Sequence, residues 1–195
     1  MHRLFPAIAE TLAAAVMLLP VFLLLTGRLF SDAKRAVLCG CFALYLSGIY
    51  ALAGLPNVLY VRFEPNINTE PFAYMFSDWD TTLLNVLLFI PLGLGLPLLW
   101  KDFGIWWKTV LFGFFLSALI EFAQIFTYRA TDINDLMTNT LGTAVGYLLF
   151  RPVVRLCPGI PGGSRQEFGA VCLITFGALF FLQPFLSRLL WFFLI

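Results

Sequence analysis

Long apolar runs separated by short polar stretches make up most of this sequence. Several runs reach the roughly 20 residues that a helix needs to cross the hydrocarbon core of a bilayer. The apolar residues are continuous rather than alternating, which favours helices over the strands of a membrane barrel. Six segments bounded by charge, Gly or Pro are predicted to be helical: 5–27, 36–55, 82–100, 104–126, 133–150 and 169–187.

The composition supports a membrane class. Of 195 residues, 61% are hydrophobic and only 12% are charged, whereas soluble domains carry about 25% charged residues. We therefore predict an all-α, polytopic bundle of about six transmembrane segments, with five as the alternative and no soluble domain. The last segment stays open. Gln183-Pro184 is placed to bend it, so 169–195 is either one span or a kinked span with an interfacial tail.

The segments suggest three parts along the chain. Residues 1–54 form an N-terminal transmembrane hairpin, 55–150 a core with three transmembrane helices, and 151–195 a loop and a C-terminal segment. The core begins with a long aromatic, proline-containing loop at 56–81. Aromatic rings favour the membrane interface. The loop is therefore either a passive interfacial anchor or a cover over a site.

The basic residues predict an orientation, because cytoplasmic loops carry the excess of Lys and Arg. Eight of the 12 basic residues fall in or beside the connections after segments one, three and five. They are Arg28, Lys34, Arg35, Lys101, Lys108, Arg151, Arg155 and Arg165. With that side cytoplasmic, loops 56–81 and 127–132 lie outside, where acidic residues outnumber basic ones.

Several kinds of chemistry have little material in this chain. His2 is the one histidine, and no basic stripe suggests nucleic acid. The four cysteines form no C-x-x-C pair, and we interpret them as small buried apolar residues. They are Cys39, Cys41, Cys157 and Cys172. We expect no cofactor, no nucleic-acid partner and an oligomeric state that the sequence leaves unknown.

The densest polar cluster, YRATDINDLMTN at 128–139, lies directly before an apolar run. Thr131 or Asp132 can cap the helix that follows, because both side chains can bind its free N–H groups. Capping does not explain Asn139, which shares a face with Asp132 and Asp135 and lies within the span. An amide at that depth needs a partner from another helix or a water-filled cavity.

Neighbouring segments offer such partners. Gly142 and Gly146 continue the face of Asn139 at a spacing that lets helices approach closely. In segment four, Glu121 lies inside apolar sequence, where an ionisable side chain indicates a functional site by default. Arg129, in the loop that follows, is its natural counter-charge, and Gln124 lies on the same face.

Segment three begins with a related pattern. DWDTTLLN at 78–85 aligns with DINDLMTN at 132–139, which places Asn85 and Asn139 at matching positions. If the match is real, two helices bring similar polar ends to one outer site. Pro91, further along segment three, is expected to kink or break the helix.

Together these residues resemble the VanZ-like family of membrane proteins. The resemblance covers roughly 55–150, whereas Glu64-Pro-Asn-Ile-Asn fits the family's Asn-Pro-Phe loop only loosely. The matching elements, in order, are Asn85, Pro91-Leu-Gly93, Ser117, Glu121, Gln124, Arg129, Asp132, Asp135, Asn139, Gly142 and Gly146. The resemblance implies a bacterial cytoplasmic (inner) membrane protein of the cell envelope. The family's namesake is associated with low-level resistance to the glycopeptide teicoplanin.

Three functions remain open. In the first, the outer polar site binds a membrane lipid, a lipid-linked or cell-wall glycan, or a glycopeptide, with Arg side chains holding an anion. The ligand-binding candidates are Asn85, Gln124, Arg129, Asp135, Asn139 and Arg62. In the second, a membrane enzyme uses Glu121, Asp132 or Asp135 as acid, base or, as weak candidates, metal ligands. In the third, the polar set holds together a non-catalytic scaffold.

Overall fold

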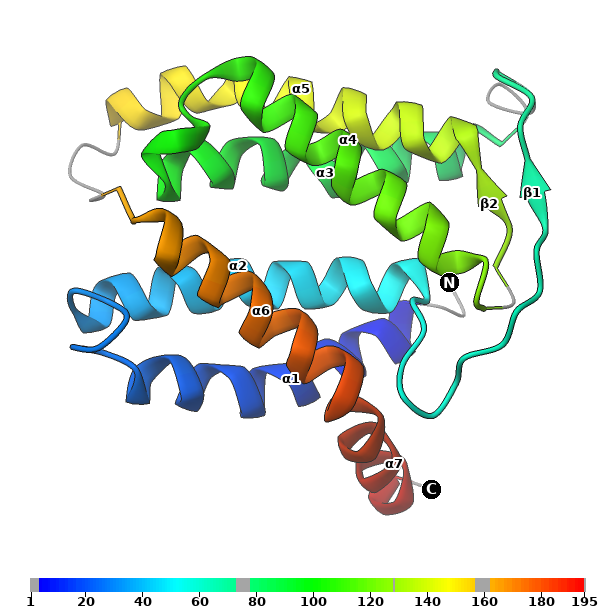
Figure 1. Ribbon diagram of the computed structural model, residues 1–195, viewed down its shortest axis with the longest axis horizontal. Coiled ribbons are helices and arrows are strands. Elements are labelled where there is room, and N and C mark those ends of the chain that lie inside the picture. Colours follow the sequence, from blue (N-terminus) through cyan, green and yellow to red (C-terminus); the bar gives the residue numbers. More distant parts are fainter. Residues whose placement is uncertain (1–3, 73–77, 128, 157–161, 195) are drawn as a thin grey trace. The chain divides into compact units, whose positions relative to one another are not determined.

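The structure is a computed structural model that describes residues 4–72, 78–127, 129–156 and 162–194. Within these residues the protein is almost entirely helical, which confirms the predicted fold class (Figure 1). The helices are α1 (Leu4–Leu24), α2 (Ala33–Ala53), α3 (Trp79–Leu99), α4 (Trp106–Gln124), α5 (Ile133–Leu156), α6 (Arg165–Phe181) and α7 (Gln183–Leu194). A short 3₁₀ turn, η1 (Lys101–Phe103), links α3 to α4, and two short strands, β1 (Ile67–Asn68) and β2 (Thr131–Asp132), pair in parallel.

Each predicted segment corresponds to a helix, and the last one corresponds to two. Four helices in the described residues, α1 to α4, are long and apolar enough to cross a membrane. The pair α6–α7 bends by 48° at Leu182 and makes a fifth span if the two act as one. At 24 residues α5 is long enough to span, but its Thr, Asn and Gly residues make it less apolar than α1 to α4.

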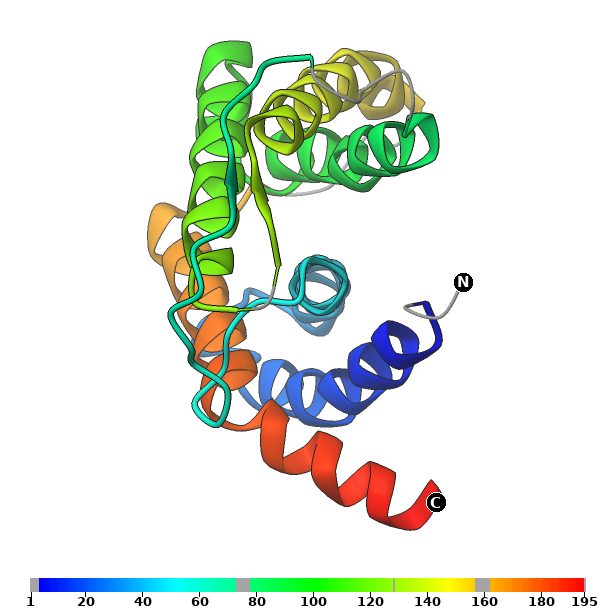
Figure 2. The ribbon, with the colours of Figure 1, turned by 90° about the vertical axis from the view of Figure 1, so that its right-hand side faces the viewer.

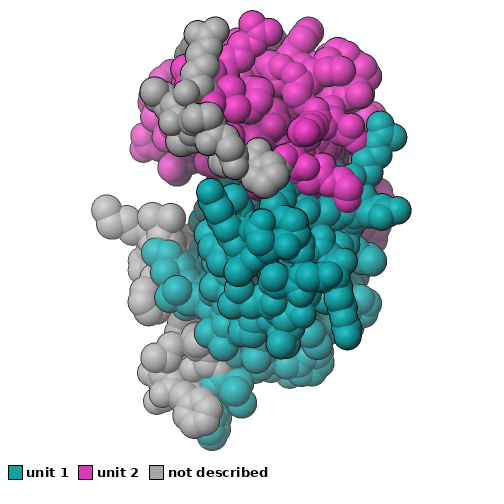
Figure 3. All heavy atoms as spheres, turned by 90° about the vertical axis from the view of Figure 1, so that its left-hand side faces the viewer, with its two compact units in different colours: residues 1–61, 165–195 teal, residues 62–164 magenta. Residues whose placement is uncertain are grey.

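The chain divides into two compact units, coloured separately in Figure 3. Unit 1 comprises residues 1–61 and 165–195, and unit 2 comprises residues 62–164. Unit 1 therefore contains α1, α2, α6 and α7, and unit 2 contains α3, α4 and α5 with both strands. The division of the chain into three successive parts stays a prediction from the sequence.

Unit 2 is built on close contact between α3 and α5. A Cβ added at Gly142 would meet the carbonyl oxygen of Val86, and one at Gly146 would meet that of Ile90. Because the contacts advance along both helices together, α3 and α5 run parallel, and the antiparallel α4 packs beside them (Figures 1 and 2). The glycine spacing thus has the packing role that the sequence predicted. At Gly93, on α3, an added Cβ would meet the backbone of Thr143.

The parallel arrangement brings one end of each helix in unit 2 together. The N-terminal ends of α3 and α5 lie beside the C-terminal end of α4, and this end contains the polar residues that the sequence singled out. Helix α3 runs without interruption from Trp79 to Leu99 through Pro91 and Pro97. Pro91 therefore does not break the helix, one of the two outcomes expected for it.

In unit 1, α1 and α2 form a hairpin, and α6 packs on α2. Asp32 caps α2 by accepting a 2.8 Å hydrogen bond from the backbone N–H of Arg35. Gly54 ends the helix at φ 62°, a left-handed conformation that glycine adopts without a steric penalty.

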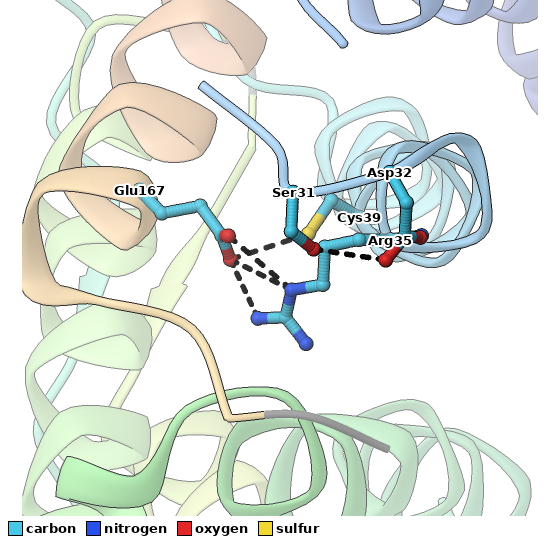
Figure 4. A network of polar contacts seen from close by, with 5 residues as sticks. All are labelled: Ser31, Asp32, Arg35, Cys39 and Glu167. Carbon is cyan, nitrogen blue, oxygen red and sulfur yellow. Dashed lines mark hydrogen bonds and ion pairs between the residues drawn. The ribbon is translucent and has the colours of Figure 1, made fainter. Parts of the chain in front are cut away.

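A buried ion pair joins α2 to α6. The Nη2 of Arg35 lies 2.5 Å from Oε1 of Glu167, and its Nε lies 3.1 and 3.2 Å from the two carboxylate oxygens (Figure 4). The side chains are only 2% and 8% exposed. The Cys39 thiol lies 3.6 Å from the same carboxylate. Charges so enclosed need a partner, so this contact ties the C-terminal part of the chain to the N-terminal hairpin.

Candidate functional site

An extended segment, residues 62–72, which we term the strap, lies along the connection between α4 and α5. The backbone N–H groups of Arg62 and Glu64 donate to the carbonyls of Phe126 and Ile125, and Thr131 N–H donates to the Asn66 carbonyl. The pairing continues as the short parallel ladder of β1 with β2 (Figures 1 and 2). Residues 62–72 of the predicted aromatic loop are therefore fixed by hydrogen bonds to the polar end of unit 2.

Asn134 fastens the far end of the strap. Its side chain is 5% exposed. Its Oδ1 accepts a 2.6 Å hydrogen bond from the Phe72 N–H, and its Nδ2 donates to the Glu70 carbonyl at 3.2 Å. Phe72 has φ 64°, which is unfavourable for a bulky residue. The Asn134 amide thus helps to hold the strap in a strained turn.

Asp132 caps α5, as the sequence predicted for Thr131 or Asp132. Its Oδ1 accepts from the backbone N–H of Asn134 at 2.8 Å and from the Asn134 amide at 2.9 Å. Its Oδ2 accepts from the Asn68 amide at 3.1 Å. The Asp132 carboxylate therefore joins the start of α5 to β1 of the strap.

Glu121 lies one helix back, in the last part of α4, and is 7% exposed. Its Oε2 accepts a 2.7 Å hydrogen bond from the backbone N–H of Asp132, and its backbone carbonyl accepts one from the Thr131 hydroxyl at 2.9 Å. The free N–H groups at a helix start carry partial positive charge. The start of α5 therefore stabilises the Glu121 carboxylate directly.

Two further amides connect α5 with its neighbours. The Asn85 amide of α3 donates to Oδ1 of Asp135 at 2.6 Å. The Asn139 amide donates to the Ser117 hydroxyl of α4 at 3.0 Å. All three helices of unit 2 thus meet through polar side chains at this end. We term the residues Asn85, Ser117, Glu121, Asp132, Asp135 and Asn139 the end cluster.

The arginine candidates differ in their relation to the end cluster. Arg129 interacts electrostatically with both Glu121 and Asp135. The backbone N–H of Asp132 is a direct hydrogen-bond partner of the Glu121 carboxylate, and the counter-charge role of Arg129 stays a prediction. Arg62 lies on the strap and pairs with Glu64 at 2.7 Å. Gln124, the remaining candidate, is 2% exposed and lies near the end of α4.

The end cluster has acceptor oxygens without donors. Oδ1 of Asn139 is fully enclosed, and no described residue donates to it. One carboxylate oxygen each of Glu121 and Asp135 also receives no hydrogen bond from a described residue. Buried polar atoms are normally paired. A ligand or water that donates a hydrogen bond would satisfy the enclosed Oδ1 of Asn139.

The described residues contain no group of three or more His, Cys, Asp or Glu side chains arranged to hold a metal ion. That search includes Glu121, Asp132 and Asp135, the weak metal candidates. Cys39, Cys41 and Cys172 are free thiols; Cys39 is buried as expected, whereas Cys172 is half-buried and Cys41 is exposed, contrary to the interpretation of the cysteines as buried. Cys157 lies outside the described residues.

The sequence missed two residues of this region as site members. Asn134 lies between Asp132 and Asp135, the two predicted aspartates. The feature of the sequence that could have identified it is a third amide or acid side chain within four residues. Ser117 lies one helical turn before Glu121, on the same face. That spacing could have identified Ser117, because it places a hydroxyl on the face of α4 where Asn139 needs a hydrogen-bond partner.

Comparison with known proteins decides the family. The sequence profile of the VanZ/LLP1 family matches residues 42–155. The chain belongs to the VanZ/LLP1 family. Protein VanZ of Enterococcus faecium is 35% identical over 117 residues, which are 57% of this chain and 71% of that protein. No solved structure matches the chain.

The matched range of this VanZ-family chain contains the strap and every residue of the end cluster. It begins at residue 42, within α2, and so extends further toward the N-terminus than the resemblance recognised from the motifs. Family membership and the apolar helices together make the chain a multi-pass membrane protein.

Proposed function

We propose that this VanZ-family protein lies in the bacterial cytoplasmic membrane and binds the headgroup of an envelope lipid or lipid-linked glycan at its end cluster. In this proposal the cluster and the strap face the outer leaflet, as the distribution of Lys and Arg favours. Binding changes how the envelope responds to glycopeptides such as teicoplanin. That last step rests on family membership, and the binding step rests on the geometry.

The observation that carries the proposal is the enclosed Oδ1 of Asn139. Asn139 lies within α5 and is 5% exposed. Its Oδ1 receives no hydrogen bond from a described residue. An unpaired buried acceptor costs about 1–3 kcal/mol. A hydrogen bond from a bound headgroup would satisfy this oxygen.

The strap supports the same interpretation. It is bound to the start of α5 through Asn68 and Asn134, so it lies against the elements that carry Asp132 and Glu121. Its exposed aromatic side chains suit the headgroup region, where rings with apolar bodies are favoured. They include Phe63, which is 67% exposed, and Phe72, which is 60% exposed.

Lipid retention tests the proposal. Native mass spectrometry of the purified protein in detergent, after incubation with lipid extract from a bacterial envelope, should detect bound lipid on the wild type. Asp135→Ala and Asn139→Ala should lose it while the thermal unfolding midpoint stays within a few degrees. Glu64→Gln, on the strap but outside the end cluster, is the matched control and should retain lipid.

Susceptibility is measured in parallel. A strain expressing the wild type is expected to tolerate more teicoplanin than one expressing Asp135→Ala or Arg129→Ala at equal protein abundance. Unchanged lipid retention in Asp135→Ala and Asn139→Ala, together with unchanged susceptibility in Asp135→Ala and Arg129→Ala, would refute the proposal. Loss of folding together with lipid would instead favour a structural scaffold, and turnover of the bound lipid that depends on Glu121 would favour an enzyme.

A further inference from the structure

The hydrogen bonds within the end cluster leave several acceptor oxygens open. The amide of Asn85 donates to Asp135, the amide of Asn139 donates to Ser117, and the backbone N–H of Asp132 donates to Glu121. Acceptor oxygens without a donor from a described residue include one each on Glu121, Asp135 and Asn139. A ligand that fits this set must donate hydrogen bonds.

The charge of the cluster selects among donors. Glu121 and Asp135 are close enough to interact electrostatically, and Asp132 interacts with both. Neither Glu121 nor Asp135 has a salt bridge with a described residue. Arg129 acts electrostatically on both carboxylates. Charged groups out of water need compensation, so the cluster favours a cation over a neutral or anionic ligand.

A primary ammonium group meets both requirements. It carries one positive charge and three N–H donors with no acceptor. Its N–H groups can therefore serve the open oxygens of Glu121, Asp135 and Asn139. Phosphate offers only acceptors and negative charge, and sugar hydroxyls donate but leave the carboxylates uncompensated.

We infer that Glu121, Asp135 and Asn139 accept hydrogen bonds from the primary ammonium group of an amine-bearing envelope headgroup. This inference rests on the proposed function and narrows its ligand. The amine can belong to a phospholipid or to an amino sugar or peptide attached to a lipid, because the recognising chemistry is the same.

Three lipids that differ only in the headgroup separate the possibilities on the wild-type protein. Phosphatidylethanolamine has a primary ammonium, phosphatidylcholine keeps the charge but has no N–H, and phosphatidylglycerol has hydroxyls without the charge. With identical acyl chains, phosphatidylethanolamine should be retained at least about tenfold more than either of the others, as loss of a charge-assisted hydrogen bond predicts. Soluble glucosamine and ethanolamine, added as competitors, show whether a sugar amine can replace the phospholipid.

Variants connect the preference to the residues. Glu121→Gln keeps an oxygen for the Asp132 N–H but removes the charge, and Asp135→Asn keeps an oxygen for Asn85. Each should reduce the preference for phosphatidylethanolamine over phosphatidylcholine about tenfold, whereas Glu64→Gln should leave it unchanged. If a variant does not fold, the comparison of the three lipids on the wild-type protein still tests the inference, because it needs no substitution.

The outcomes separate this inference from the proposed function. Equal retention of all three lipids, or stronger retention of phosphatidylglycerol or of a lipid-linked glycan without an amine, overturns the ammonium inference and leaves headgroup binding intact. Absence of any retained lipid or glycan overturns both. A preference that persists in both carboxylate variants assigns amine recognition elsewhere and overturns the inference.

Discussion

The Arg35–Glu167 pair makes a quantitative prediction about how the N-terminal hairpin holds α6. In Glu167→Gln the shape of the side chain is kept and one carboxylate charge is removed. The Arg35 guanidinium then stays buried, with a side chain 2% exposed, without the anion that lies 2.5 Å from its Nη2. Breaking a buried pair by removing one partner costs about 3–5 kcal/mol, because an uncompensated charge remains.

For a chain of this size, 1 kcal/mol shifts the unfolding midpoint by about 2–4 °C. We therefore expect Glu167→Gln to lower the midpoint by roughly 6–20 °C. Differential scanning fluorimetry of the protein in detergent measures it. The control is Glu64→Gln, which breaks the exposed Arg62–Glu64 pair. The Arg62 side chain is 64% exposed and the Glu64 side chain is 37% exposed. Exposed pairs contribute about 0–1 kcal/mol, so the control should shift by less than about 4 °C.

A double variant distinguishes charge burial from loss of packing. Arg35→Met with Glu167→Leu removes both charges and keeps apolar volume, and such replacements of buried pairs are often neutral or stabilising. The double variant should therefore unfold at a higher temperature than Glu167→Gln. The reasoning is refuted if Glu167→Gln shifts the midpoint no more than Glu64→Gln does, or if the double variant is the least stable of the three.

Three further predictions concern unit 2. Gly146→Ala should lower the unfolding midpoint, because its Cβ would meet the Ile90 carbonyl, whereas Gly177→Ala, with nothing within 4 Å, should leave it unchanged or raise it slightly. Equal shifts would argue against close packing of α3 on α5. Asn134→Ala should speed amide hydrogen exchange in the strap, measured by mass spectrometry, because Phe72 and Glu70 lose their partner. Glu70→Gln is the control, and unchanged exchange in Asn134→Ala would contradict the fastening role. Asp132→Ala removes the cap of α5 and should cost about 1 kcal/mol, measured by chemical denaturation in detergent, with Asp132→Ser losing less.

Sequence reasoning predicted the features that depend on local pattern. In a bilayer, backbone groups must be satisfied within the segment, so a continuous apolar run of sufficient length forms a helix. The Gly142 and Gly146 spacing predicted a packing face for the same local reason, since residues four apart share a face of a helix. The cap at Asp132 needed only the polar residue before an apolar run.

The tertiary structure alone decided which residues meet. Arg35 and Glu167 are 132 positions apart, and neither segment has a sequence feature that identifies the other as its partner. The periodicity of α5 places Asp135 and Asn139 on one face, but only the packing of α3 and α4 pairs them with Asn85 and Ser117. The hydrogen bond from the backbone N–H of Asp132 to Glu121 likewise became evident only from the tertiary structure. Helical periodicity fixes the direction of a side chain, whereas its partner depends on how separate helices pack.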